Sequence, residues 1–252
     1  MAGLLWIPLT LALCRFIPVM VVSPFGLLGQ VPPVARVGLA GVMALIAWPL
    51  WLSHGSPVLP GGAQLALLYA ENLVLGWGIA VVPALVGSVL NVIGETLDAN
   101  FGWALVQIVS VGSQPTSLMG TLFPLVGGML LVSQGGLSVI FGTLIRSVVD
   151  HPLTEPLVTG GWLHGLAMLA ASAWQYGLEL TAPMLVILLM INLITGVIAR
   201  LIPQFQVLTL QFPLLTLVGT GIVLIAWPSL ASLTSALLGV MQSALSGLLA
   251  AV

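Results

Sequence analysis

The chain has 252 residues, of which 60% are hydrophobic and only 4% are charged, and its formal net charge is −2. Soluble globular domains carry about a quarter charged residues, so this composition excludes that class and indicates a membrane-associated, all-α protein. The net charge is too small to indicate a nucleic-acid or acidic partner. No low-complexity linker or run of charge divides the chain, which predicts a single domain.

Six apolar stretches approach the roughly 20 residues that a helix needs to cross a bilayer. In chain order they cover residues 4–22, 34–52, 65–93, 118–149, 163–202 and 207–230, and an amphipathic or apolar tail covers 231–252. The fifth stretch is too long for one ordinary crossing, which predicts a break or a kink at Pro183. Prolines also occur within nearly all of the remaining stretches, so we expect kinked and broken helices.

Charged side chains occur within or at the edge of these stretches, where each costs about 2.5 to 3.5 kcal/mol unless it is paired or hydrated. They are Arg15, Glu71, Glu95, Asp98, Glu179 and Arg200. The four basic residues are all arginines, so no lysine anchors a loop. The charge pattern therefore does not predict how the chain is oriented in the membrane. We therefore expect the charges to face protein or water, in a subunit that packs mainly against other polypeptides.

The acids Glu95 and Asp98 stand three residues apart and would share one helix face. They could form a proton or cation site in a carrier, or they could pair with arginines across helix contacts. The candidate partners are Arg15, Arg36, Arg146 and Arg200. Pairing is the favoured interpretation, because charges in apolar spans rarely stay unpaired.

A polar segment without charge, residues 110–117, follows these acids after an apolar stretch, and it is the best candidate for the working part of the chain. Gly112 and Pro115 disfavour a continuous helix there, and the apolar Leu118 and Met119 flank it. Irregular backbone beside apolar stretches needs water or protein partners, because lipid offers no hydrogen bonds. The alternative is a superficial connection between two helices.

A catalytic function has little support in the sequence, which contains none of the common catalytic or nucleotide-binding motifs. His54, His151 and His164 lack the spacing of metal ligands, and Cys14 is the single cysteine. We therefore predict no enzyme activity, no cofactor and no metal site.

The run over residues 191–219 predicts two helices joined by a turn. Asn192 and Arg200 are eight residues apart, so both could project toward one partner face. Pro203 ends the first helix, and the polar set that begins at Gln204 precedes Pro213. This arrangement is typical of an αα-hairpin, although the same sequence pattern also fits a capped loop between two helices.

These landmarks together resemble the FliR/SctT family, the export-gate subunit of flagellar and virulence type III secretion systems. The C-terminal signature consists of Asn192, Gly196, Arg200, Pro203, Gln204, Phe212, Pro213 and Gly219. The other landmarks are Pro24, Pro32, Pro33 and Arg36 near the N-terminus, and Gly94, Glu95, Gly102, Gly135 and Gly136 in mid-chain. The chain departs from the family at Phe205, Gln206 and Gln211, and Ile108 and Val109 stand where an Asp-Pro pair is common. Phe212, Pro213 and Gly219 favour the flagellar branch, and the virulence branch is the alternative.

The resemblance implies a fold and a set of partners that hydropathy does not show. It implies a FliP-like part over about residues 1–180, joined to a FliQ-like helical hairpin and tail over about 181–252. One copy would complete a helical ring of FliP-like and FliQ-like subunits around a pore for unfolded export substrates. FlhB-like and FlhA-like export components would accompany that ring, in the bacterial inner membrane at the flagellar basal body. An ion-coupled secondary transporter is the less favoured alternative.

The resemblance assigns a role to one segment, and the charges and prolines of the chain predict roles for other residues. The implied pore plug consists of Ser110, Val111, Gly112, Ser113, Gln114, Pro115, Thr116, Ser117, Leu118 and Met119. The charges expected to act in assembly are Arg15, Arg36, Glu95, Asp98 and Arg200. The expected hairpin turn is marked by Pro203, Gln204, Phe212 and Pro213.

Overall fold

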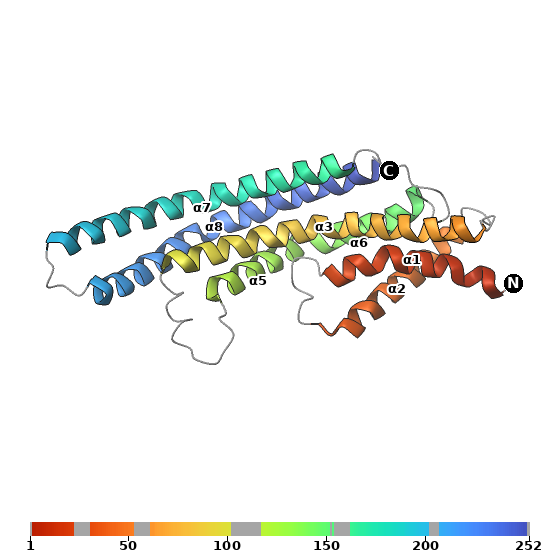
Figure 1. Cartoon of the computed structure of the whole chain (residues 1–252), viewed down its shortest axis with the longest axis horizontal. Helices are drawn as coiled ribbons and strands as arrows, with labels where there is room; N and C mark the ends of the chain where they lie inside the picture. Colours follow the sequence, from red (N-terminus) through yellow and green to blue (C-terminus); the bar gives the residue numbers. More distant parts are fainter. Residues whose placement is uncertain are drawn as a thin grey trace.

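The computed structural model describes residues 2–22, 31–52, 61–101, 117–151, 153, 162–201 and 207–250. Within these ranges the chain is helical apart from short turns and contains no strand, which confirms the predicted all-α class. The helices are α1 (Ala2–Val22), α2 (Pro33–Leu52), α3 (Gly62–Phe101), α5 (Leu118–Ser133), α6 (Gly136–Asp150), α7 (Trp162–Leu201) and α8 (Val207–Ala250) (Figure 1).

The helices form an elongated bundle in which α3 is the central element. Helix α3 contacts α1, α5, α6, α7 and α8, and the long α7 and α8 lie side by side along the bundle (Figure 1). Along α3, the side chains of Ile79, Val82, Val86, Leu90 and Leu97 are completely buried. The core is therefore built around α3, and the other helices cover its faces.

The described residues support fewer membrane spans than the six apolar stretches of the sequence. Within the described ranges, three helices are long and apolar enough to cross a membrane, namely α3, α7 and α8. Helices α5 and α6 pass the same test only as a pair that is bent by 64°, which gives up to four spans. The described apolar parts of α1 and α2, Trp6–Val22 and Pro33–Pro49, are shorter than the test requires. The expected tail is the end of α8, which continues to Ala250.

The sequence predicted a break or a kink at Pro183, but no helix ends at that residue. Helix α7 continues through Pro183, as α3 does through Pro83 and α8 does through Pro213 and Pro228. In long apolar helices, neighbouring helices and local adjustment make up for the hydrogen bond that a proline removes. The sharp bend occurs instead between α5 and α6, where Gly135 has a φ of 91°. That left-handed conformation favours glycine, which has no Cβ to clash.

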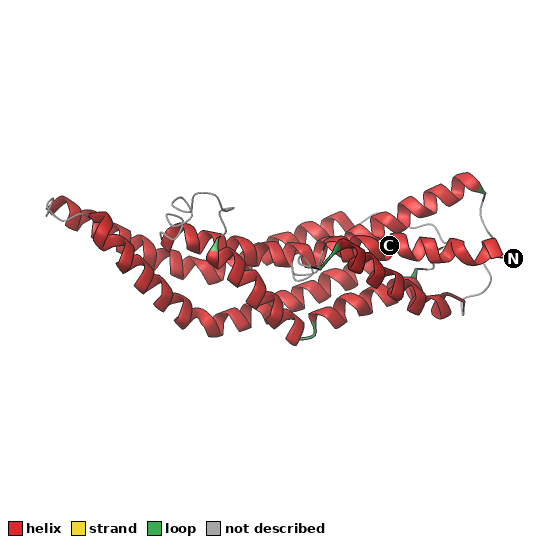
Figure 2. Ribbon diagram, turned by 90° about the horizontal axis from the view of Figure 1, so that it is seen from below, coloured by secondary structure: helices red, strands yellow, loops and turns green. Residues whose placement is uncertain are grey.

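Glycines let the helices approach closely. A Cβ on Gly76 of α3 would strike the backbone of Arg15 in α1. A Cβ on Gly127 of α5 would lie 2.7 Å from Leu90 Cδ1 of α3. Both contacts confirm close packing of α3 against its neighbours. Seen at 90° to the first view, the bundle is bowed along its length (Figure 2).

Candidate functional site

The candidate site lies where α3 ends and α5 begins, on either side of the segment predicted to be the working part. Residues 110–116 of that segment, and residues 102–109 before it, lie outside the described part of the chain. Of the predicted plug, only Ser117, Leu118 and Met119 are described. The structure therefore defines the base of this segment, where its two ends meet the helices.

Ser117 and Asp98 together cap the first turn of α5. Ser117 precedes the helix in an extended conformation, and its Oγ accepts a hydrogen bond from Gly120 N at 2.8 Å. The same hydroxyl donates to Asp98 Oδ2, which also accepts from Met119 N at 3.2 Å. Two N–H groups at the start of a helix, which would otherwise lack partners, are thus satisfied. One contact spans 19 positions of sequence and ties α3 to the start of α5.

The carboxylate of Asp98 is buried at this junction, with 2% of the residue exposed. A negative charge at a helix N-terminus is stabilised by the helix dipole, by up to about 2 kcal/mol in partly buried geometry. The other oxygen, Oδ1, is buried and has no hydrogen-bond partner within the described residues. A Cβ on Gly94, one turn earlier, would strike the backbone of Met119. Glycine at this position is what lets α5 begin so close to α3.

Glu95 and Asp98 do not form the paired acid site that their spacing allowed. Glu95 is exposed and accepts a hydrogen bond from Asn91 Nδ2 at 3.1 Å, whereas Asp98 is buried against α5. The described ranges contain no group of three or more His, Cys, Asp or Glu residues that could hold a metal ion. The two acids therefore have separate environments and separate partners.

Arg15 is the second buried charge, and it lies at the other end of the α5–α6 pair. Its side chain is completely buried in α1, and its Nη1 donates to Ser147 O and, at 3.0 Å, to His151 O. These carbonyls belong to the last turn and the C-cap of α6, where a cation is favoured, and Ser147 O also accepts a hydrogen bond from His151 N at 3.3 Å. Within the described residues, Arg15 is therefore bonded to helix-end carbonyls and to the Asn72 amide and not to a carboxylate, and its Nη2 has no partner.

Asn72 and His151 complete this cluster, and the sequence analysis did not identify either role. Asn72 Oδ1 accepts from Arg15 Nε at 2.9 Å, and its Nδ2 donates to Leu68 O at 2.7 Å and to Leu153 O at 3.1 Å. His151 Nε2 bonds to Leu249 O at 2.8 Å, which connects α6 to α8. A buried amide inside an apolar stretch was the available signal, because such groups require partners.

The other predicted site residues are spread over the bundle. Arg36 Nε donates to Val31 O at 2.9 Å, and its Nη1 donates to Val21 O at 3.4 Å, so it joins the end of α1 to the start of α2. Arg200 is exposed in the last turn of α7.

The expected hairpin turn is shorter than predicted. Pro203 and Gln204 lie outside the described residues, whereas Phe212 and Pro213 lie within α8, which begins at Val207. Helices α7 and α8 do pack against each other as a pair.

Long apolar helices, with buried charges bonded to helix ends, define the chain as a membrane-associated, all-helical protein. The chain belongs to the bacterial export proteins, family 1, whose family model matches residues 6–241. This match confirms the family that the sequence motifs resembled, and it makes the chain a membrane-located export protein. The matched range includes Asp98, Ser117 and the helices that carry them.

The chain is similar to several curated export proteins over most of its length. It is 24% identical over 202 residues to the flagellar biosynthetic protein FliR of Caulobacter vibrioides, which covers 80% of each chain. It is 26% identical over 170 residues to the protein of that name from Aquifex aeolicus, covering 64% of this chain and 63% of the relative. The corresponding protein of Escherichia coli is 22% identical over 204 residues, covering 80% of this chain and 77% of the relative.

The geometry of Asp98 predicts a graded response to substitution. Asp98→Ala removes the acceptor for Ser117 Oγ and Met119 N, and leaving such buried donors unpaired costs about 1 to 3 kcal/mol. Asp98→Asn keeps one carbonyl oxygen as an acceptor, so it should lose less. Thermal unfolding of the detergent-solubilised chain measures both. Glu95→Gln, one turn earlier and exposed, is the matched control and should change stability by less than about 0.5 kcal/mol. Equal loss from Asn and Ala would contradict the capping role.

The geometry of Arg15 predicts a second effect on stability. Arg15→Gln removes the charged donors to Ser147 O and His151 O, and each hydrogen bond from a charged group contributes about 1.5 to 3 kcal/mol. We expect a loss of about 3 kcal/mol in the same unfolding measurement. Arg146→Gln is the control, because Arg146 is exposed and has no hydrogen bond within the described residues. Similar losses from the two variants would show that Arg15 does not fasten α6.

Proposed function

We propose that the chain is a pore-forming subunit of the flagellar type III protein export gate, which passes unfolded flagellar proteins across the bacterial inner membrane. The observation that carries this proposal is the family match over residues 6–241, together with relatives that are each named flagellar biosynthetic protein FliR. Those names favour the flagellar branch over the virulence branch. An ion-coupled transporter that uses Glu95 and Asp98 has less support, because one acid is exposed and the other caps a helix.

The proposal places the chain in a ring with FliP-like and FliQ-like subunits, next to FlhA-like and FlhB-like components at the basal body. The unequal burial of the long helices supports a role among other subunits. In the apolar stretch of α3 that could span a membrane, 56% of the residues are buried. In the corresponding stretches of α7 and α8, only 17% of the residues are buried. Large apolar side chains on α7 and α8 are correspondingly exposed, such as Leu201 at 73%, Leu217 at 76% and Ile225 at 82%. Such surface is suited to contact with lipid or with other subunits.

The contrast between the buried α3 and the exposed α7 and α8 can be compared with the proposed FliP-like and FliQ-like parts of the chain. The FliP-like part, about residues 1–180, contains α3 and the helices packed around it. The FliQ-like part, about 181–252, consists of the end of α7 and all of α8. In this interpretation, Arg200 is available for contacts between subunits, and Arg15 and Arg36 hold the chain's own helices together.

Deleting the gene in its host tests the function. Export of hook and filament proteins should stop, because the gate would lack one wall, and general secretion should continue. Immunoblots of culture medium for filament protein and of periplasm for a generally secreted enzyme measure the two pathways, and a plasmid copy should restore export. Normal flagella in the deletion strain would overturn the proposal. Loss of a host-directed export pathway beside normal flagella would assign the chain to the virulence branch.

We further propose that the predicted plug, residues 110–119, acts within the pore through residues 110–116, whereas Ser117, Leu118 and Met119 anchor it at the start of α5. A channel wide enough for an unfolded polypeptide would leak ions when idle, so it needs an obstruction that can be displaced. The tie between Asp98 and Ser117 supports this role, because it holds the two flanking helices together independently of the segment that connects them. The alternative is that this segment only connects α3 to α5.

Removal of the segment distinguishes these alternatives. Deleting residues 111–116 keeps Ser117 and the cap of α5, and residues 102–110 remain to bridge the helices. A plug predicts a severalfold rise in the ion conductance of the assembled complex in planar bilayers, with unchanged assembly. Deleting residues 154–159, an equal length between α6 and α7, is the matched control and should not raise conductance. Unchanged conductance in the first variant, with the complex intact, would identify the segment as a connection.

A further inference from the structure

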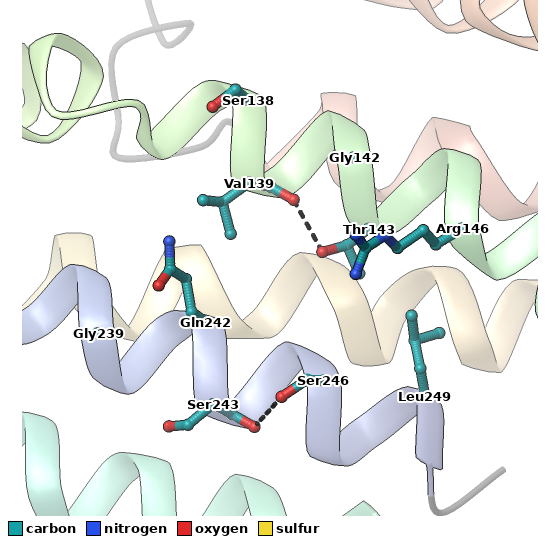
Figure 3. A pocket seen from close by; sticks show the side chains of 10 residues that line it. All are labelled: Ser138, Val139, Gly142, Thr143, Arg146, Gly239, Gln242, Ser243, Ser246 and Leu249. Atoms are coloured by element: carbon teal, nitrogen blue, oxygen red, sulfur yellow. Dashed lines mark hydrogen bonds between the residues drawn. The ribbon is translucent and has the colours of Figure 1, made fainter.

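A polar groove of about 560 Å³ lies between α6 and α8 (Figure 3). Helix α6 lines it with Ser138, Gly142 and Arg146, and α8 lines it with Gly239, Gln242 and Ser246 among others. Among the described residues that line this groove none is acidic, and Arg146 is the one charged group. The groove is thus distinct from the Asp98 junction and from the Arg15 cluster.

The groove is open above its glycines, and hydroxyl groups along its walls already donate hydrogen bonds within their own helices. A Cβ added to Gly142 or Gly239 would meet no atom within 4 Å, so the space above both glycines is free. The Ser138 hydroxyl donates to Gly135 O at 2.6 Å, and the Thr143 and Ser246 hydroxyls likewise donate to carbonyls of their own helices, at 2.8 and 3.0 Å. These walls can therefore admit another helix closely, without leaving hydroxyl protons unpaired.

Arg146 is the charged group among the described residues of this groove, and it lacks a partner there. Its side chain extends along the groove toward Thr143 (Figure 3), and it makes no hydrogen bond or ion pair within the part of the chain that the structure describes. Both α6 and α8 belong to candidate membrane spans, where an arginine is costly unless it is paired or hydrated. An occupant of the groove would therefore have to present an acceptor, and a negative charge is the best match for a guanidinium.

We propose that this groove receives a helix of a neighbouring subunit, with small residues against Gly142 and Gly239 and an Asp or Glu side chain bonded to Arg146. The inference rests on the proposed function, which supplies neighbouring subunits. An anionic lipid could match Arg146 through its phosphate, but its acyl chains would then lie against serine hydroxyls and Gln242. A helix with small residues fits these polar walls better, because its backbone can approach the glycines.

Photo-crosslinking in the assembled apparatus tests this proposal. A benzophenone amino acid at Gly142 or Gly239, in native membranes, should form an adduct with one protein of the apparatus. Mass spectrometry should map that adduct to an apolar helix that carries a small residue and an acid. Arg146→Glu should lower the adduct yield by about tenfold or more, because it places like charges together, and Arg146→Lys should lower it much less. Gln175→Glu is the control, since this residue is exposed on α7 and does not line the groove, and the added negative charge should leave the yield unchanged.

A charge exchange guards against indirect effects of the substitution. Changing the mapped acid to arginine in the Arg146→Glu background should restore the adduct. An adduct with lipid alone, or an equal yield from Arg146→Glu and wild type, would overturn the proposal. The gene deletion tests the proposed export function independently of this test of the groove. An acid-bearing helix captured in a strain whose deletion mutant keeps normal flagella would support the groove and overturn only the proposed function.

Discussion

A helix that ends inside an apolar bundle leaves peptide N–H or C=O groups without partners, and the α5–α6 pair ends twice in this way. Asp98 of α3 meets the N–H groups where α5 begins, and Arg15 of α1 meets the carbonyls where α6 ends. Each buried charge faces the helix end of opposite partial charge. The same two contacts therefore solve two problems, since they satisfy the helix ends and also stabilise charges that an apolar interior would otherwise disfavour.

The bend between α5 and α6 gives this pair a third attachment. Gln134 stands at the bend, and its Nε2 donates to Thr234 Oγ1 of α8 at 3.1 Å. The pair is thus held at its start by α3, at its bend by α8 and at its end by α1. Because these attachments are distributed along the pair, α5 and α6 remain packed in the bundle although the chain bends by 64° between them. The bend depends on Gly135, which adopts the left-handed conformation that other residues disfavour.

Apolar periodicity and local signals predicted the elements of this fold much better than they predicted its contacts. The all-α class and the start of a helix at Leu118 follow from apolar runs and from the polar residues that precede them. The Gly135-Gly136 pair was present in the sequence as a signal of a break, whereas Pro183 was the site predicted and lies within continuous helix. The expectation that buried charges pair with opposite charges considered only side chains. Helix ends also carry partial charge, but their positions depend on tertiary packing, which one sequence does not reveal.

Arg15 and Arg146 show how far the chain satisfies its own charges. Arg15 is buried and bonded to carbonyls of α6, whereas Arg146, on α6 itself, extends into an open groove and has no partner within the described residues. The exposed apolar side chains of α7 and α8 offer area for burial, but apolar area alone accepts many partners in many registers. A single unpaired arginine accepts far fewer, because a helix that places its acid one turn away leaves the charge unmatched. On the proposal above, the apolar faces would supply most of the affinity between subunits, and the groove would determine which helix binds and in which register.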